Sequence, residues 1–153
     1  MSLLTSINEK VPGDFFFTTP SPVGQITGPG IIGTITRANP TVSTIIPYTF
    51  KAGVYFVSLQ VELDVNTSTV GDVLICSTAQ DGVLNPDQII QTTNTSNIAS
   101  GEAVRLMLTG YINAQPGPTG LNIVVSTYTA IGVSSSYQIQ IPTDSKIFIQ
   151  QVA

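Results

Sequence analysis

A period of two in the side chains of residues 53–63 constrains the fold of this chain more than any other feature. One set of alternate positions is apolar, namely Tyr55, Val57, Leu59, Val61 and Leu63, and Ser58, Gln60 and Glu62 lie between them. Successive side chains of a β-strand point to opposite faces of the sheet. The pattern therefore predicts a strand with one face in a core and the other face exposed.

The same period of two recurs along the chain. It is clear in residues 102–112, 121–125 and 137–141, and in the first of these Arg105, Thr109 and Tyr111 are expected to face outward. Less regular β-branched and aromatic runs occupy residues 15–18, 31–37, 41–46, 72–78, 88–93 and 146–152. Residues 87–92 follow Asn85-Pro86 and are also compatible with a single helical turn. About ten short strands separated by Gly, Pro and Asn turns predict an all-β antiparallel sandwich or barrel.

The chain offers few of the side chains on which catalysis at neutral pH depends. It has no His, a single Cys, and only nine acidic and five basic residues among 153. Because His, Cys, Lys and paired carboxylates supply most general acids, bases and nucleophiles, we expect a protein that is not an enzyme and carries no cofactor. Cys76 lies in an apolar run and is expected to be a small buried hydrophobe.

The low charge also bears on partners. The five basic residues are scattered, so no basic stripe is available for a nucleic acid backbone. A charged fraction of 9% is far below the roughly 25% of an average soluble domain. A surface with so little charge favours association, and we expect the protein to be an oligomer of copies of itself.

Two acidic residues are the best candidates for hidden chemistry. Glu62 and Asp64 alternate onto the same polar strand face. A glycosidase would need such a carboxylate pair, with partners from loops such as Asp72, Asp81 or Asp87. We interpret the pair as part of a solvated strand face, and no dense acidic loop with metal-ligand spacing occurs, so we predict no catalytic residue and no metal site.

The first forty residues are richer in Gly and Pro than the rest. We expect them to form an N-terminal arm or a pair of edge strands, followed by the main domain in residues 41–153. Phe15, Phe16 and Phe17 are adjacent, so on a strand at least one ring must meet a second apolar surface. That surface is the core of a buried strand or a subunit contact. Phe15, Phe16, Phe17 and Tyr111 are our candidates for subunit contacts.

One segment resembles a known class of proteins. Residues 49–59, Thr-Phe-Lys-Ala-Gly-Val-Tyr-Phe-Val-Ser-Leu, are similar to the part of compact jelly-roll domains in which a loop ending in Ala-Gly leads into a core strand rich in Tyr and Phe. The resemblance extends to tumour-necrosis-factor-like and complement heads and to single jelly-roll capsid, penton and fibre proteins of viruses. It implies a single jelly roll of about eight core strands with additional N-terminal strands or an arm.

The two classes of similar proteins, secreted heads and viral structural proteins, differ in whether they are exported from the cell. Secreted trimeric heads carry a signal or a stalk, whereas residues 1–10 show neither a signal-peptide core nor a preceding basic region. We therefore expect a virion structural protein that folds in the host cytoplasm. Its expected role is a capsid penton or minor capsid subunit in a symmetric ring, a pentamer in preference to a trimer, with itself and other capsid proteins as partners.

The alternative from another class is the receptor- or carbohydrate-binding head of a viral or phage fibre, or a lectin-like trimeric module. Its ligand surface would come from polar loops such as residues 92–100 and 113–119. Tyr111 is the aromatic residue nearest to these loops, whereas sugar binding commonly uses aromatic rings at loop tips.

Overall fold

The computed structural model describes residues 24–84, 86–95, 98–117 and 120–153, and within these ranges the secondary structure consists of strands without a helix. The strands are β1 (Gly24–Thr27), β2 (Gly30–Thr36), β3 (Thr41–Ile46), β4 (Gly53–Thr67), β5 (Val73–Gln80), β6 (Gln88–Asn94), β7 (Ala103–Ala114), β8 (Leu121–Thr127), β9 (Ser136–Ile141) and β10 (Lys146–Gln151).

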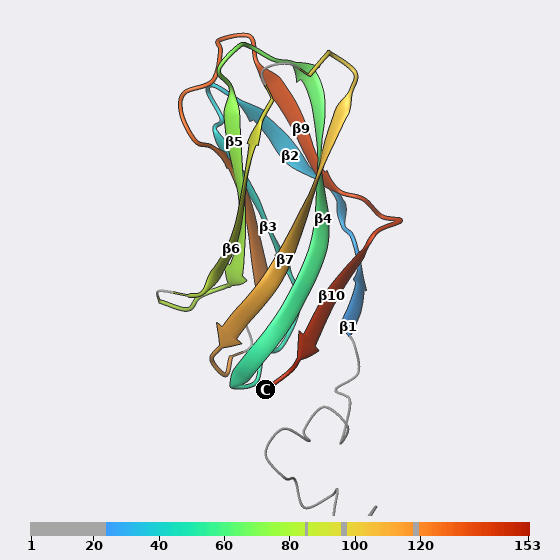
Figure 1. The fold of residues 1–153 in the computed structure, drawn as a ribbon, viewed down its shortest axis with the longest axis vertical. Coiled ribbons are helices and arrows are strands. Elements are labelled where there is room, and N and C mark those ends of the chain that lie inside the picture. The colour runs from blue at the N-terminus through green and yellow to red at the C-terminus, as the bar shows by residue number, and fades with distance from the viewer. Residues whose placement is uncertain (1–23, 85, 96–97, 118–119) are drawn as a thin grey trace, which may run out of the picture.

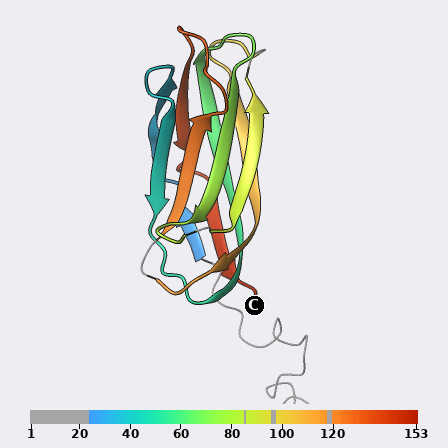
Figure 2. The ribbon, with the colours of Figure 1, turned by 90° about the vertical axis from the view of Figure 1, so that its left-hand side faces the viewer.

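Two antiparallel sheets face each other (Figure 1). Sheet A has the order β1-β10-β4-β9-β2, and β7 pairs with the other side of β4. Sheet B has the order β3-β8-β5-β6, and its four strands lie side by side at the front of Figure 2. The described part is all-β, as the sequence predicted, and every pair of neighbouring strands is antiparallel.

The long strand β4 explains why sheet A contains six strands. Residues 55–58 of β4 pair with β10, and residues 62–67 pair with β9. Since β10 then pairs with β1, and β9 with β2, β1 and β2 follow one another along the edge of the sheet as one interrupted strand. In the same way, β9 and β10 form a second interrupted strand between them and β4. Counted in this way, four strands face four strands, which is the arrangement of a jelly roll.

At the interruption in sheet A, Gly28 lies against the backbone of residues 141–145. A Cβ atom at this position would lie 2.2 Å from the carbonyl oxygen of Pro142, which is far inside van der Waals contact. The Gly28 N–H donates a hydrogen bond of 3.3 Å to the carbonyl of Ser145. Glycine thus allows the break between β1 and β2 to lie directly against the break between β9 and β10.

The core lies between the inner faces of the two sheets. Sheet A contributes the alternate apolar positions of β4 that the sequence predicted, all nearly inaccessible, with Leu108, Ile112, Tyr137 and Ile139 from neighbouring strands. Sheet B contributes Leu74, Cys76, Ile123 and Val125 among others. The predicted burial of Cys76 is confirmed. At the end of the sandwich, Tyr48, Phe50 and Tyr55 pack edge to face with ring centroids 4.8–6.0 Å apart.

The local predictions have different outcomes. The single helical turn considered for residues 87–92 is wrong, since β6 covers residues 88–92 and pairs with β5 along its whole length. Strand β1 was not predicted. A strand at residues 15–18 and the position of Phe15, Phe16 and Phe17 lie outside the described residues. Of the segment 1–40, the described part forms β1 and β2 at the edge of sheet A.

Candidate interaction surfaces

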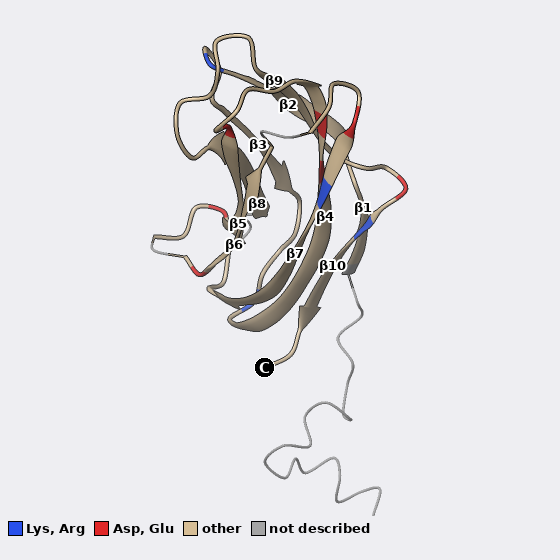
Figure 3. Ribbon diagram, turned by 45° about the horizontal axis from the view of Figure 1, so that its top comes forward, with Lys and Arg blue, Asp and Glu red and all other residues tan. Residues whose placement is uncertain are grey.

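The outer face of sheet B is a surface without charge. None of the residues in β3, β5, β6 and β8 is acidic or basic. The side chains that alternate with the buried ones point outward, and together they define what we call the uncharged face: Thr41, Ser43, Ile45, Val73, Ile75, Ser77, Gln88, Ile90, Thr92, Asn94, Asn122, Val124 and Ser126. Ile45 and Ile90 are 52% and 50% exposed. Figure 3 shows the charged residues on sheet A and in loops instead.

The composition of the uncharged face suits a protein contact. Moving a charge out of water is costly unless the charge finds a partner. A surface of Ile, Val, Thr, Ser and Asn loses little on desolvation and gains from buried apolar area. The two edge strands of the sheet, β3 and β6, also lack the Lys residues and inward charges by which free sheet edges commonly avoid pairing with other chains.

A group of exposed and half-buried aromatic rings occupies the outer face of sheet A. Phe56 on β4 and Tyr111 on β7 are cross-strand partners, with centroids 5.6 Å apart and planes at 61°. Phe148 on β10 is diagonal to Phe56, because Gln150 lies opposite Phe56 and Phe148 lies opposite Ser58. Aromatic side chains at such diagonal positions are within reach of one another. We call Phe56, Tyr111 and Phe148 the aromatic patch.

The aromatic patch bears on the candidate residue Tyr111. Its predicted outward orientation agrees with the structure, in which Tyr111 is 64% exposed. Sequence reasoning missed Phe56 and Phe148, although both occupy outward positions of their strands. Which outward residues become neighbours depends on the register of β4, β7 and β10, and that register was not readable from the alternation. Whether Tyr111 contacts another subunit stays a prediction.

The two acids singled out by the sequence do share an outer face, on β4 beyond Ser58 and Gln60 from the aromatic patch. The Glu62 carboxylate accepts a hydrogen bond of 2.6 Å from Nε of Arg105 and one of 2.9 Å from the amide of Gln140. The same amide donates to Asp64 across 2.7 Å. Partial burial and the neighbouring Glu62 charge raise the pKa of Asp64 above its ordinary value. The Gln140 amide thus bridges the two carboxylates, and the Arg105 guanidinium binds Glu62.

Asp72, proposed as a loop acid, lies elsewhere and is only 2% exposed. Its carboxylate accepts four hydrogen bonds, from the backbone N–H groups of Thr69 and Gly132 at 3.0 Å and from the hydroxyls of Ser135 and Tyr137 at 2.5 Å. Burial opposes the charge of Asp72, but these hydrogen bonds outweigh burial and lower the pKa. Asp72 therefore fastens the loop between β8 and β9 to the start of β5.

In the described residues no group of three or more His, Cys, Asp or Glu side chains is placed to hold a metal ion.

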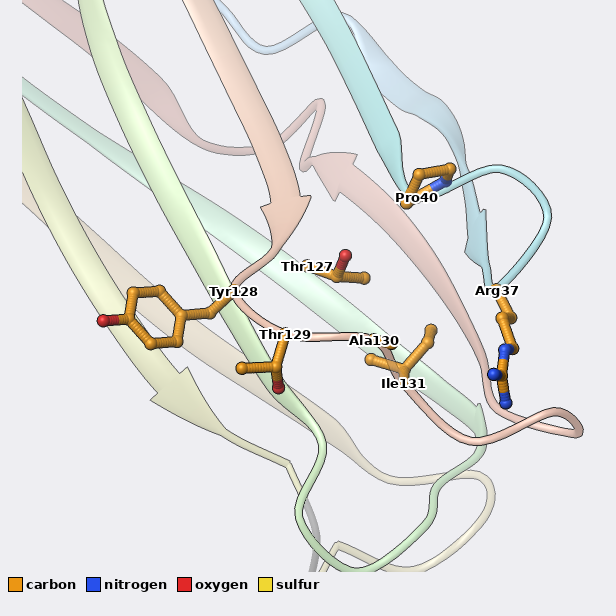
Figure 4. A pocket seen from close by; sticks show the side chains of 7 residues that line it. All are labelled: Arg37, Pro40, Thr127, Tyr128, Thr129, Ala130 and Ile131. Carbon is orange, nitrogen blue, oxygen red and sulfur yellow. The ribbon is translucent and has the colours of Figure 1, made fainter.

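An open pocket of about 380 Å³ lies where the turn between β2 and β3 meets the loop after β8 (Figure 4). Its lining residues are Arg37, Pro40, Thr127, Tyr128, Thr129, Ala130 and Ile131. Arg37 is the charged residue of this lining, and the ring of Tyr128 points away from it in Figure 4. The lining brings no nucleophile, acid and base together.

The loops of the alternative binding-head hypothesis do not form one surface. The loop before β7 and the loop after β7 are separated by the whole length of that strand, Ala103–Ala114, and lie at opposite ends of the sandwich in Figure 1. Residues 96–97 and 118–119 in these loops are outside the described part.

Among the described residues, no helix has the length and apolar character needed to cross a membrane.

No protein-family model and no curated protein sequence matches the chain. Among solved structures, the N-terminal CBM22-1–GH10 modules of Clostridium thermocellum xylanase 10B, complexed with xylohexaose, are similar over 88% of this chain, with 9% identity and a TM-score of 0.43. This chain spans a quarter of that xylanase chain.

Two further similar structures come from other groups of proteins. Eiger TNF from S. frugiperda is 13% identical over 88% of this chain and 94% of its own, with a TM-score of 0.41. A chain of infectious bursal disease virus, Gt strain, is 13% identical over 84% of this chain and 28% of its own, with a TM-score of 0.42. These similarities concern the β-sandwich fold alone.

Proposed function

We propose that this chain is a non-enzymatic structural subunit of a virion, a capsid penton or minor capsid protein that assembles with copies of itself into a symmetric ring. The observation that carries the proposal is the uncharged face, a complete outer sheet surface without an acidic or basic residue. The resemblance of residues 49–59 to single jelly-roll capsid proteins supplies the virion context.

Charge explains why the contact would use this face. Each copy carries a net charge of −4, so copies repel one another at long range. A contact surface without charges adds no cost of burying an unpaired ion to that repulsion. On sheet B a second subunit can approach without desolvating an ion. A surface four strands wide and about seven residues long measures roughly 19 Å by 23 Å.

The size of the face is consistent with one side of a ring contact. Its projected area of about 440 Å² is roughly half of the 800 Å² that each partner contributes to a standard interface. Loops at its rim would supply the remainder. In a ring, the uncharged face of one copy packs on a different surface of the next, because head-to-tail contacts close only when two distinct surfaces meet.

Mass in solution tests the ring. Sedimentation at micromolar concentration is expected to show a species of several times the chain mass of 16.1 kDa, five times for the favoured pentamer. Ser77→Lys places a cation at the centre of the uncharged face, between Ile90 and Val124, and is expected to shift the protein to monomers.

Gln138→Lys is the matched control. It adds the same charge to a half-buried position on the outer face of sheet A, opposite Asp64, and is expected to leave the mass unchanged. A wild-type protein that stays monomeric throughout, or two variants that dissociate equally, would contradict the proposal. If the ring forms, electron microscopy of virions that contain the protein would locate the subunit and count the copies around each symmetry axis.

A further inference from the structure

We propose that the aromatic patch on sheet A is the docking site for residues 15–17 of an adjacent copy, so that each subunit of the assembly receives the Phe-Phe-Phe segment of a neighbour. This inference rests on the proposed assembly and deepens it by assigning a receiving surface to the N-terminal arm. Its support comes from the patch, from the place where the described chain begins, and from the chemistry of the segment.

The patch offers room for further rings. Tyr111 is 64% exposed, and its edge-to-face packing on Phe56 leaves the remaining ring surface to solvent. The neighbouring outward side chains Ser58 and Thr109 are joined by a hydrogen bond of 3.1 Å between their hydroxyls. Because these two hydroxyls already bond to each other, an incoming phenylalanine would not leave either of them without a hydrogen-bond partner. Aromatic pairs add about 0.5–1.5 kcal/mol to the gain from buried area.

The described chain begins at the same end of sheet A. Gly24, the first residue of β1, lies opposite Ile149 of β10, and Ile149 lies opposite Val57 of β4. The next cross-strand row of the sheet contains Gln150, Phe56 and Tyr111. The N-terminal segment therefore leaves each subunit at the level of the aromatic patch, and neighbours in a ring would present both features at the same height.

The segment matches the patch in chemistry. Residues 15–23 read Phe-Phe-Phe-Thr-Thr-Pro-Ser-Pro-Val and contain no charge. Docking such a segment on an aromatic surface desolvates no ion, and each ring buries a large apolar area. The patch residues Phe56, Tyr111 and Phe148 lie on three different strands, so the receiving surface is wide enough for more than one ring.

Pro20 and Pro22 bear on how far the segment can reach from the start of β1. Pro20 and Pro22 favour extended backbone at their own positions and at the residues before them. At about 3.1 Å per residue, residues 18–24 span roughly 20 Å, which exceeds the roughly 14 Å from β1 to β7 across three strand spacings. Residues 18–24 are therefore long enough to reach beyond the patch of their own subunit, and the proposal assigns the phenylalanines to the patch of the next one.

Disulfide trapping with full-length chains tests the docking. In a Cys76→Ala background, one chain carries Phe16→Cys and a second carries Tyr111→Cys, and the two are mixed and oxidised under mild conditions. The expected result is a covalent pair of one chain of each kind. A third chain with Thr34→Cys, on β2 and therefore away from the patch, replaces the Tyr111→Cys chain as the control and is expected to give about tenfold less product.

The outcomes separate this inference from the proposed assembly. Equal crosslinking with the Tyr111→Cys and Thr34→Cys chains, in mixtures that sediment as rings, would overturn the docking and leave the assembly standing. A chain that carries both Phe16→Cys and Tyr111→Cys and closes a disulfide only within itself would also overturn it. As a second readout, Tyr111→Ala should weaken retention of the segment about tenfold, the loss typical of a removed aromatic contact residue. Protection of residues 15–17 from limited proteolysis in the assembled protein measures that retention.

Discussion

The hydroxyl of Tyr137 donates a hydrogen bond of 2.5 Å to the buried carboxylate of Asp72, and 65 residues of sequence separate the two. Tyr137 stands on the inner face of β9, whereas Asp72 precedes β5 in the other sheet. The hydroxyl of Thr95 donates to Tyr137 across 2.9 Å. One polar contact inside the sandwich thus links the two sheets and the loop after β6. Burial, together with the hydrogen bond to Asp72, raises the pKa of Tyr137 to about 12.

Asp72→Asn is expected to destabilise the fold by about 2–4 kcal/mol, since an amide nitrogen would face groups that donate hydrogen bonds. The pKa of Asp72 is lowered in the folded protein. Its stabilisation is therefore complete above the ordinary pKa near 3.8 and is lost as pH falls through the folded value. Urea unfolding between pH 2 and pH 7 measures this, with the exposed Asp144→Asn as control. A variant with the same pH dependence as wild type would contradict the role.

Thr78→Val is expected to stabilise the protein by about 1 kcal/mol. The hydroxyl of Thr78 is buried and has no hydrogen-bond partner among the described residues, so replacing it with a methyl group of similar size removes a desolvation cost. Thr95→Val is the matched comparison, because the equally buried Thr95 hydroxyl is bonded to Tyr137. It should lower the unfolding midpoint. Two variants that shift the midpoint in the same direction would contradict the distinction.

Cys76 is expected to report unfolding through its reactivity. Burial raises the pKa of its thiol to about 12, so the native protein should react slowly with a thiol-specific disulfide reagent because the thiolate is the nucleophile. In urea the reaction should become fast, with a midpoint equal to that of the circular dichroism transition. Rapid labelling under native conditions would show that sheet B opens locally without global unfolding.

Asp64→Asn and Glu62→Gln should change stability in opposite directions at pH 7. The pKa of Asp64 is raised, so the stability it contributes at low pH is lost as pH rises through the folded value. An asparagine removes that loss and still accepts the hydrogen bond from Gln140. Glu62→Gln instead breaks the ion pair with Arg105 and should cost up to about 1 kcal/mol, because Arg105 is largely exposed. Thermal melts at pH 4 and pH 7 give the comparison.

Most of the fold was predictable because its signals are local. The alternation around Tyr55 and Leu59 specified β4, and its continuation beyond residue 63 was the main underestimate. Strand β1 was not predicted because a segment of four residues, Gly24–Thr27, is too short to show a period of two. Its assignment as a strand depends on pairing with β10, a partner more than a hundred residues away in the sequence. The turn alternative for residues 87–92 failed for the same reason, since pairing with β5 outweighs the local preference after Pro86.

The candidate surfaces were only partly visible in the sequence. Tyr111 could be assigned an outward position from alternation alone, but its neighbours Phe56 and Phe148 follow from the register of three strands. The uncharged face has the same origin. The absence of charge in each strand is a property of the sequence, whereas β3, β8, β5 and β6 become one surface only through pairing.

The sequence by itself determined the strand content, the buried side of each long strand and the low charge, because side-chain alternation and composition depend on neighbouring residues alone. The tertiary structure decided which strands lie together, and thereby placed Asp72 beneath Tyr137, Phe56 beside Tyr111 and the four uncharged strands in one sheet. The physical reason is that strand order and register are set by hydrogen bonds and packing between distant segments, whose cost of loop closure and gain in burial no short stretch of sequence contains.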